Sequence, residues 1–196
     1  MISRVALATI VVVLGVTAQP AFADKYLDEY TPPLTELGRG RIAQLAENPL
    51  VVDAIKAQNA VTSGYDQTKI DALDAQWVAE VDAKNKPLIE ATLGNAAAKF
   101  LAAAQDESAG LFTEIFVTDA KGLDVAQSTI TSDYWQGDEA KFTESFGKGP
   151  GAVFLGDIEQ DESTQAFQSQ VSIAIIDPAT GAAIGSITVG VDLSQI

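Results

Sequence analysis

The stretch LFTEIFVTDAKGLDVAQST, residues 111–129, marks the point at which the sequence changes its hydrophobic period. Apolar residues before this stretch recur every three or four positions, as in helices, whereas here they alternate as in strands. Asp119 and Gly122, between the two halves of the stretch, are residue types that favour a tight turn. The stretch therefore predicts a β-hairpin with strands at 111–118 and 123–129.

The region before the hairpin, residues 24–110, is predicted to be helical. Asn48 and Pro49 form a helix-start signal, with asparagine as the N-cap and proline in the first turn, so the first long helix is expected to break there. A second amphipathic helix follows, and another helix is predicted to begin at Pro87. The apolar positions of the second helix are Ile70, Leu73, Trp77, Val78 and Val81. We expect Trp77 to be a core residue because it lies on this apolar stripe.

The region after the hairpin predicts one short helix and three more strands. The helix is expected from Tyr134 to about Phe146, with Asp133 and Gln136 as a capping box. The strand segments are AVFLGDIE, QAFQSQVSIAIID and AAIGSITVGVDL, and we expect them to form an antiparallel meander. The fold class is therefore α+β, with the sheet part at 111–196.

The first 23 residues have the pattern of a secretory signal peptide. Arg4 precedes an apolar run, Val5–Val16, and the small-residue motif AFA ends at Ala23. The run is shorter than the roughly 20 residues that span a bilayer. We therefore expect cleavage after Ala23, a periplasmic or secreted location, and a single domain over residues 24–196.

The composition disfavours several classes of function. The 196 residues include 12 basic and 27 acidic ones, and loss of a signal peptide with one basic residue leaves a net charge of −16. Such a charge repels phosphate backbones, so no nucleic acid partner is expected. The chain has no Cys and no His, which removes disulfides, thiol and histidine catalysis, and the usual zinc sites. A hydrolase that uses Asp or Glu pairs is still open, but no acid–base pair stands out in the sequence. We therefore predict a protein without enzymatic activity, and we predict no cofactor and no metal.

Tyr134 and Trp135 are adjacent large aromatic residues in a chain with two Trp and four Tyr. Neighbouring positions of a helix differ by about 100° in direction, so one core does not easily bury both side chains. These two residues are therefore either core or the wall of a pocket. Aromatic walls with a polar tip suit small polar molecules and cationic amines.

The segment QAFQSQVSIAIID carries a second group of candidate residues. Gln168 and Gln170 lie on the face opposite to the apolar Val171 and Ile173, because side chains alternate along a strand. This polar face is either solvated or covered by a helix. A cover would make the two amides hydrogen-bonding groups inside a pocket.

A cluster of acidic residues lies near the end of the first of these three strands. Its members are Asp157, Glu159, Asp161 and Glu162. Carboxylate oxygens suit calcium, but the spacing matches no EF-hand loop. A solvated turn is the favoured interpretation.

Three segments together resemble the extracytoplasmic Cache (PAS-like) sensor domains of bacterial chemoreceptors and sensor kinases. They are IFVTDAKGLDVAQS, TSDYWQGDEAKF and DPATGAAIGSITVGVDL, and LAENPLVVDAIKAQN looks like the long N-terminal helix of such domains. The resemblance covers nearly all of the chain after the signal peptide. It implies a five-stranded antiparallel sheet with the long helix on one face, and a short helix with loops above a ligand pocket on the other.

The resemblance also implies which residues contact a ligand. Tyr134 and Trp135 fall where Cache pockets take aromatic contacts. Asp133, Gln168 and Gln170 complete the set of ligand-binding residues that we predict. The expected ligand is an amine or an amino acid, because no Arg remains after the first helix and the chain is acidic.

The predicted function is that of a single-domain, secreted sensor module that binds a small molecule. We expect it to pass ligand occupancy to a membrane-bound signalling partner through a shift of conformational population. The alternative is an interaction or structural protein of the envelope with an inert Cache-like fold. The N-terminal helix either forms a homodimer through Leu34, Leu37 and Leu45, or buries these leucines in its own core.

Overall fold

Helices occupy the first part of the described chain and strands the second. The computed structural model describes residues 20–160 and 167–196, with side chains from Glu29 onward apart from residues 160–166. The helical segments are α1 (Pro20–Leu37), the π-helix η1 (Gly38–Ile42), α2 (Ala43–Ala46), α3 (Pro49–Thr62), α4 (Gln67–Val81), α5 (Pro87–Gly94), α6 (Ala96–Asp106), α7 (Ala140–Thr143) and the 3-10 turns η2 (Phe146–Lys148) and η3 (Leu193–Gln195). The strands are β1 (Phe112–Asp119), β2 (Asp124–Gln127), β3 (Val153–Leu155), β4 (Glu159–Gln160), β5 (Phe167–Ile176) and β6 (Ala183–Asp192). The order confirms the α+β class.

The strands form one antiparallel sheet in the order β2-β1-β6-β5-β3, and the two-residue β4 pairs with β5. The predicted hairpin is confirmed as β1 and β2. Its turn is held by Asp119, whose Oδ1 accepts hydrogen bonds from the backbone N–H of Lys121 at 2.8 Å and of Leu123 at 3.1 Å. The register shifts after Val117, where β2 carries one extra residue.

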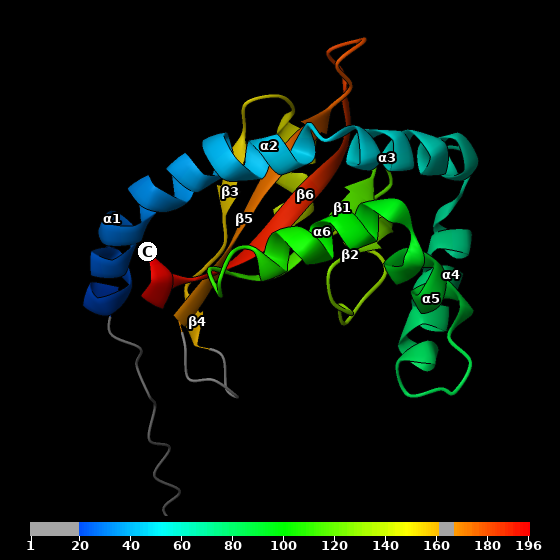
Figure 1. Cartoon of the computed structure of the whole chain (residues 1–196), viewed down its shortest axis with the longest axis horizontal. Helices are drawn as coiled ribbons and strands as arrows, with labels where there is room; N and C mark the ends of the chain where they lie inside the picture. The colour runs from blue at the N-terminus through cyan, green and yellow to red at the C-terminus, as the bar shows by residue number, and fades with distance from the viewer. Residues whose placement is uncertain (1–19, 161–166) are drawn as a thin grey trace, which may run out of the picture.

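One face of the sheet is covered by α1, α2, α3 and α6, as Figure 1 shows. The core between these layers is aliphatic and includes Ile42, Val51, Ile55, Leu101, Ile115, Val117, Val171, Ile187 and Val189. Full burial of one such side chain stabilises a fold by about 1.5–3 kcal/mol, so this layer contributes much of the driving force for folding.

The long N-terminal helix packs closely on the sheet at Gly38, in the π-helical turn. A Cβ atom at this position would lie 2.9 Å from Cγ1 of Val153, so a larger residue would push the helix away. The predicted break is confirmed: Asn48 caps α3 by accepting a hydrogen bond from the backbone N–H of Leu50 at 2.9 Å. Leu34 is buried within the core of its own chain. The homodimer stays a prediction.

The α4–α5 pair extends beyond the β2 edge of the sheet (Figure 1). A second, smaller core lies there and contains Ile70, Trp77, Ile89, Leu123 and Tyr134. Trp77 is a core residue, as predicted. The predicted apolar stripe of α4 is wrong at its end, because Val78 is 53% and Val81 37% exposed. Both side chains are therefore in contact with solvent rather than with the core.

The helix predicted from Pro87 is in fact two helices, α5 and α6, which meet at Asn95. The Asn95 side chain accepts a hydrogen bond from the backbone N–H of Ala98 and donates one to the carbonyl of Val125 at 2.8 Å. The sequence signal that was missed is Gly94 followed by a capping Asn.

The N-terminal predictions fall largely outside the described residues. The apolar run of the signal peptide lies there, and Ala23 lies within α1. Cleavage and export stay predictions. Within the described ranges, no helix has both the length and the apolar character that crossing a bilayer requires.

Candidate functional site

The sheet face opposite to α3 and α6, here called the far face, is polar and buried. Residues paired directly across antiparallel strands share a face, which groups Phe116 with Thr188 and Ser172. The hydroxyls of Ser172 and Thr188 are 2.9 Å apart, and those of Thr118 and Ser186 are 2.7 Å apart. This face therefore differs in chemistry from the aliphatic face under the helices.

The segment 131–148 covers the far face, with α7 and η2 against β5 and β6. The rings of Phe142 and Phe146 stack with centroids 4.9 Å apart. The Lys141 amine lies 5.5 Å above the ring of Phe116 and pairs with a Glu139 carboxylate oxygen at 2.9 Å. The short helix with loops on this face, implied by the resemblance, is confirmed.

A polar groove of about 290 Å³ lies beside this cover, at the ends of β1, β5 and β6. Its charged residues are Glu114, Glu139, Lys141, Asp157 and Glu159. Gln168 and Gln170 line the same groove, and the Gln170 amide donates a hydrogen bond to Glu114 Oε1 at 2.8 Å. Carboxylates outnumber the single amine, so the groove favours a cationic guest. The structure thus brings two of the predicted site residues together.

Asp124 is a fully buried carboxylate at the β2 end of the far face. Its Oδ2 accepts hydrogen bonds from the Gln127 amide and from the Thr131 hydroxyl, whereas its Oδ1 has no partner among the described residues. Burial raises the pKa of Asp124 well above its ordinary value, and the hydrogen bonds and nearby Lys141 oppose this only in part. Sequence analysis missed Asp124, because its burial depends on a cover that no local pattern reveals.

Gln136 is the second buried side chain with an atom that lacks a partner. Its amide donates to the carbonyl of Asp133 at 3.0 Å, but its Oε1 accepts from no described residue. Buried acceptors are normally satisfied, so each of these two atoms is a place where a bound donor would be stabilised.

The helix predicted to begin at Tyr134 is wrong. Residues 134–136 are not helical: Trp135 forms an isolated antiparallel bridge with Leu123, the Asp124 N–H donates to the carbonyl of Tyr134, and the Gln136 N–H donates to the carbonyl of Gly122. Helical turns begin only with α7. The capping box is also wrong, because the Asp133 carboxylate accepts from the Ser132 hydroxyl and caps no helix. The two hydrogen bonds with Asp124 and Gly122 satisfy backbone groups of Tyr134 and Gln136 that a helix would otherwise have satisfied.

Tyr134 and Trp135 point into different surroundings. Tyr134 stacks on Trp77 with ring centroids 5.4 Å apart and lines an apolar cavity among the helices. Trp135 donates from its Nε1 to the carbonyl of Lys121 at 2.8 Å and lines an acidic cleft of about 440 Å³. The carboxylates of this cleft belong to Asp71, Asp74, Asp133, Asp138 and Glu139.

The five predicted ligand-binding residues are therefore distributed over three cavities. Asp133 and Trp135 share the acidic cleft, Gln168 and Gln170 share the polar groove, and Tyr134 lies in neither. Glu139 lines both the cleft and the groove, so these two adjoin. The binding role of all five residues stays a prediction.

The predicted acidic turn is only partly described. Asp157 and Glu159 border the groove, whereas Asp161 and Glu162 lie outside the described residues. Across residues 20–160 and 167–196, no group of three acidic side chains is arranged to hold a metal ion. The described part of the turn therefore gives no support to a calcium site.

No family model and no curated protein matches the chain. The chain is similar to solved sensor domains. The sensor domain of the V. cholerae histidine kinase DctB is 15% identical over 89% of this chain and 57% of that chain, with a TM-score of 0.48. The sensory domain of the Campylobacter jejuni chemoreceptor Tlp3 with isoleucine bound is 14% identical over 90% and 64%, with a TM-score of 0.37. The ligand-binding domain of the Pseudomonas aeruginosa amino acid chemoreceptor PctC in complex with GABA is 11% identical over 88% and 62%, with a TM-score of 0.41. This chain spans less than two thirds of the length of each.

Proposed function

We propose that this protein is a ligand-binding sensor domain of the cell envelope whose ligand carries a cationic amine. The observation that carries the proposal is the polar groove on the far face. Four carboxylates, from Glu114, Glu139, Asp157 and Glu159, face one amine there. Such an excess of negative charge around a concave site attracts and orients a cation.

The ligand is held by charge and by amide hydrogen bonds. Its ammonium group competes with Lys141 for the carboxylate of Glu139, and the amides of Gln168 and Gln170 bind its neutral polar groups. Because the two amides come from alternate positions of β5, they lie in a row along the groove and favour an elongated molecule such as an amino acid or an alkyl amine over a compact ion.

Occupancy is passed on through the segment 131–148. Glu139 and Lys141 of this segment line the groove, so a bound ligand contacts the segment there. Tyr134, nearer the start of the segment, is hydrogen-bonded to Asp74 on α4, so a movement of the segment reaches that helix. A ligand that binds one arrangement of the segment better shifts the population toward it. A membrane-bound signalling partner would then read the change, without turnover of the ligand.

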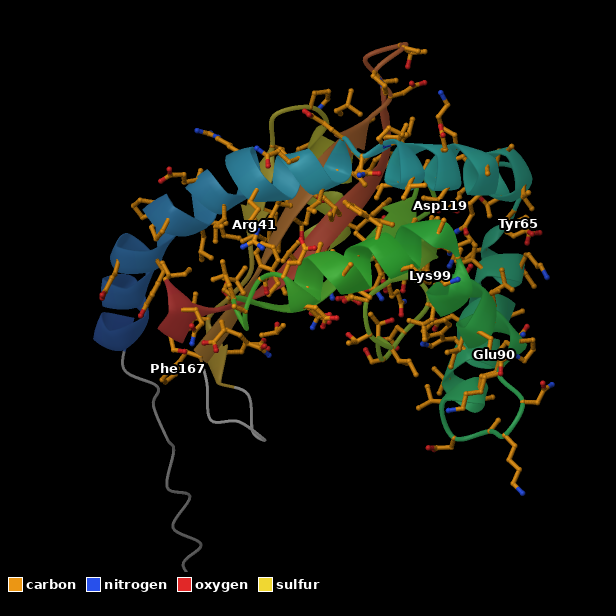
Figure 2. All side chains as sticks on the ribbon, in the orientation of Figure 1. Arg41, Tyr65, Glu90, Lys99, Asp119 and Phe167 are labelled. Carbon is orange, nitrogen blue, oxygen red and sulfur yellow. The ribbon has the colours of Figure 1, made fainter. Side chains whose placement is uncertain are left out.

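Calorimetric titration of the purified protein with amines, amino acids and small carboxylates tests the proposal. An amine is expected to bind saturably, and Glu139→Gln is expected to weaken it about tenfold. Glu90→Gln is the matched control, since Glu90 lies exposed on α5, away from the groove (Figure 2). Binding restricted to carboxylates, or unchanged in Glu139→Gln, would contradict the proposal.

The second candidate function is protein binding by an inert fold. It is favoured by exposed apolar residues on α3 and α4, since Val61 is 64% and Val78 is 53% exposed. A well-folded protein that binds no small molecule in the titrations would favour this function over the first.

A further inference from the structure

The start of the segment 131–148 is fixed to β2 through a buried network around the carboxyl group of Asp124. The backbone N–H of Asp124 donates to the carbonyl of Tyr134 at 2.9 Å. The Gln127 amide donates both to Asp124 Oδ2 and, at 2.8 Å, to the hydroxyl of Thr131, whose backbone N–H donates to Gln127 Oε1 at 3.3 Å. The side chains of this network are buried, so it holds one end of the segment against the far face away from water.

The Thr131 hydroxyl has one proton and two oxygen neighbours that compete for it. They are the carbonyl oxygen of Asp133 at 2.7 Å and Asp124 Oδ2 at 3.2 Å. The carbonyl is the nearer oxygen and can only accept, so it takes the hydroxyl proton. The contact between Thr131 and Asp124 then has a donor only when Asp124 is protonated. The hydrogen-bond geometry therefore favours the neutral acid while the segment is closed over the sheet.

The burial of Asp124 favours the neutral acid as well. The residue is 0% exposed, and its Oδ1 has no partner among the described residues, so an ionised carboxylate would lack donors for one of its two oxygens. Gln136, beside the bridge between Leu123 and Trp135, also has a buried oxygen without a described partner. This region thus has an excess of acceptors, and a proton on Asp124 reduces it.

The charged groups that act on Asp124 come from two elements and oppose each other. Asp119, at the end of β1, repels a negative charge on Asp124, whereas Lys141 on α7 attracts it. The Lys141 amine is already paired with Glu139 at 2.9 Å, which weakens this attraction. Burial is the larger effect, and it raises the pKa of Asp124 well above its ordinary value.

The remaining elements packed on β2 contribute neutral groups. The Gln58 amide on α3 donates to the carbonyl of Asp124 at 3.2 Å, and the Asn95 amide, between α5 and α6, donates to the carbonyl of Val125 at 2.8 Å. The phenol of Tyr134, in the segment itself, is neutral at physiological pH because burial raises its pKa. None of these three side chains compensates a charge on Asp124 as a cation would.

We propose that Asp124 is a proton-operated latch, which holds the start of the segment 131–148 closed over the far face while it is protonated and releases it when it ionises. In the open arrangement the carboxyl group meets water and ionises near its ordinary value of 3.8. The opening equilibrium therefore rises with pH above this value, by up to about tenfold per pH unit. The latch needs no ligand, so it stands or falls independently of the proposed amine sensor.

Hydrogen exchange of the purified protein from about pH 4 to about pH 8 tests the latch. The backbone amides of residues 131–148 are expected to be less protected than those of α6, because the latch opens without unfolding of the core. Their protection, corrected for the intrinsic exchange rate, is expected to fall by up to about tenfold per pH unit within this range. Protection that does not vary with pH, or that equals the protection of α6, would overturn the proposal.

Asp124→Asn separates the latch from other effects of pH. The asparagine is a neutral analogue of the protonated acid, because it keeps an acceptor for Gln127 and offers a donor to Thr131. The protection of the segment is expected to be independent of pH in this variant. Asp138→Asn is the matched control, since Asp138 is exposed in the same segment, and it is expected to keep the pH dependence. A pH dependence that persists in Asp124→Asn, or is lost in Asp138→Asn, would overturn the assignment to Asp124.

Thr131→Val tests the network without a change of charge. Valine keeps the size of threonine and removes the hydroxyl that contacts Asp124 and Asp133. The protection of the segment is expected to fall about tenfold at about pH 4, where the latch of the unmodified protein is closed. Circular dichroism checks that each variant is folded. Undiminished protection in folded Thr131→Val would overturn the proposal.

Discussion

The carboxylate of Asp74 on α4 accepts hydrogen bonds from the backbone N–H of Tyr134 at 2.8 Å and of Trp135 at 3.0 Å, across 60 and 61 positions of sequence. One side chain thus fixes the segment that covers the far face to the helices beyond the sheet edge. Asp74→Ala leaves both amides without this acceptor and is expected to lower the free energy of unfolding by about 2 kcal/mol. Chemical denaturation measures the loss.

Asp71→Ala is the control for this prediction. Asp71 lies on the same helix, is exposed, and accepts a hydrogen bond from the side chain of Gln67, four residues earlier, at 2.7 Å. Its removal is expected to change stability by less than about 0.5 kcal/mol. Equal losses in the two variants would show that Asp74 has no special role in holding the segment.

Glu80 gives the stability of the α4–α5 pair a dependence on pH. Desolvation by burial raises its pKa, but hydrogen bonds from Gln76 and from the backbone N–H groups of Ile89 and Leu88 outweigh this, so the pKa is lowered from 4.5. A carboxylate with a lowered pKa in the folded state stabilises the fold above its unfolded pKa, and the contribution is lost as pH falls through the folded value.

Glu80→Gln tests this dependence. The variant is expected to be less stable than the unmodified protein near neutral pH, because an uncharged amide oxygen accepts the α5 hydrogen bonds more weakly. The difference should shrink as pH falls below about 4.5. Thermal unfolding from about pH 7 to about pH 3 measures it. A difference that does not vary with pH would mean that Glu80 acts through packing alone.

The parts of the fold that sequence predicts correctly are those set by neighbouring residues. Asp119 holds its own turn through Lys121 and Leu123, and Asn48 caps the helix that Pro49 begins. Such contacts span only a few positions, so the residue pattern reveals them. The alternation that placed Gln168 and Gln170 on a polar face is of the same kind.

The parts that sequence does not predict depend on residues far apart in the chain. Tyr134 has a plausible helix start before it, yet hydrogen bonds to the distant Asp74 and to Asp124 of β2 hold it in a non-helical conformation. The sequence places Tyr134 and Trp135 together because they are adjacent, but the non-helical backbone directs one side chain into the apolar cavity and the other into the acidic cleft. Asp124 shows no signal at all, since its burial comes from a cover that begins at residue 131.

Gly185 is required by the close packing of β6 against β1. A Cβ atom at this position would clash with the backbone carbonyl of Thr118, which cannot move without breaking the strand pairing. Gly185→Ala is expected to lower the free energy of unfolding by about 2–3 kcal/mol, as overpacking does elsewhere. Gly94→Ala, where nothing lies within 4 Å, is the control and is expected to be neutral or slightly stabilising. A Gly185→Ala variant as stable as this control would contradict the close approach.

Asp124 is expected to make the protein less stable as pH rises. Its pKa is raised in the folded state by burial, so folding favours the protonated acid, and stability falls as pH rises from the ordinary value of 3.8 towards the folded value. Asp124→Asn keeps an acceptor for Gln127 and Thr131 and carries no charge, so it is expected to be more stable than the unmodified protein at neutral pH. The advantage should vanish as pH falls below 3.8, which denaturation at a series of pH values measures. If Asp124→Asn is instead the less stable protein at neutral pH, the hydrogen bonds from Gln127 and Thr131 and the attraction of Lys141 together outweigh burial, and the buried carboxylate is ionised.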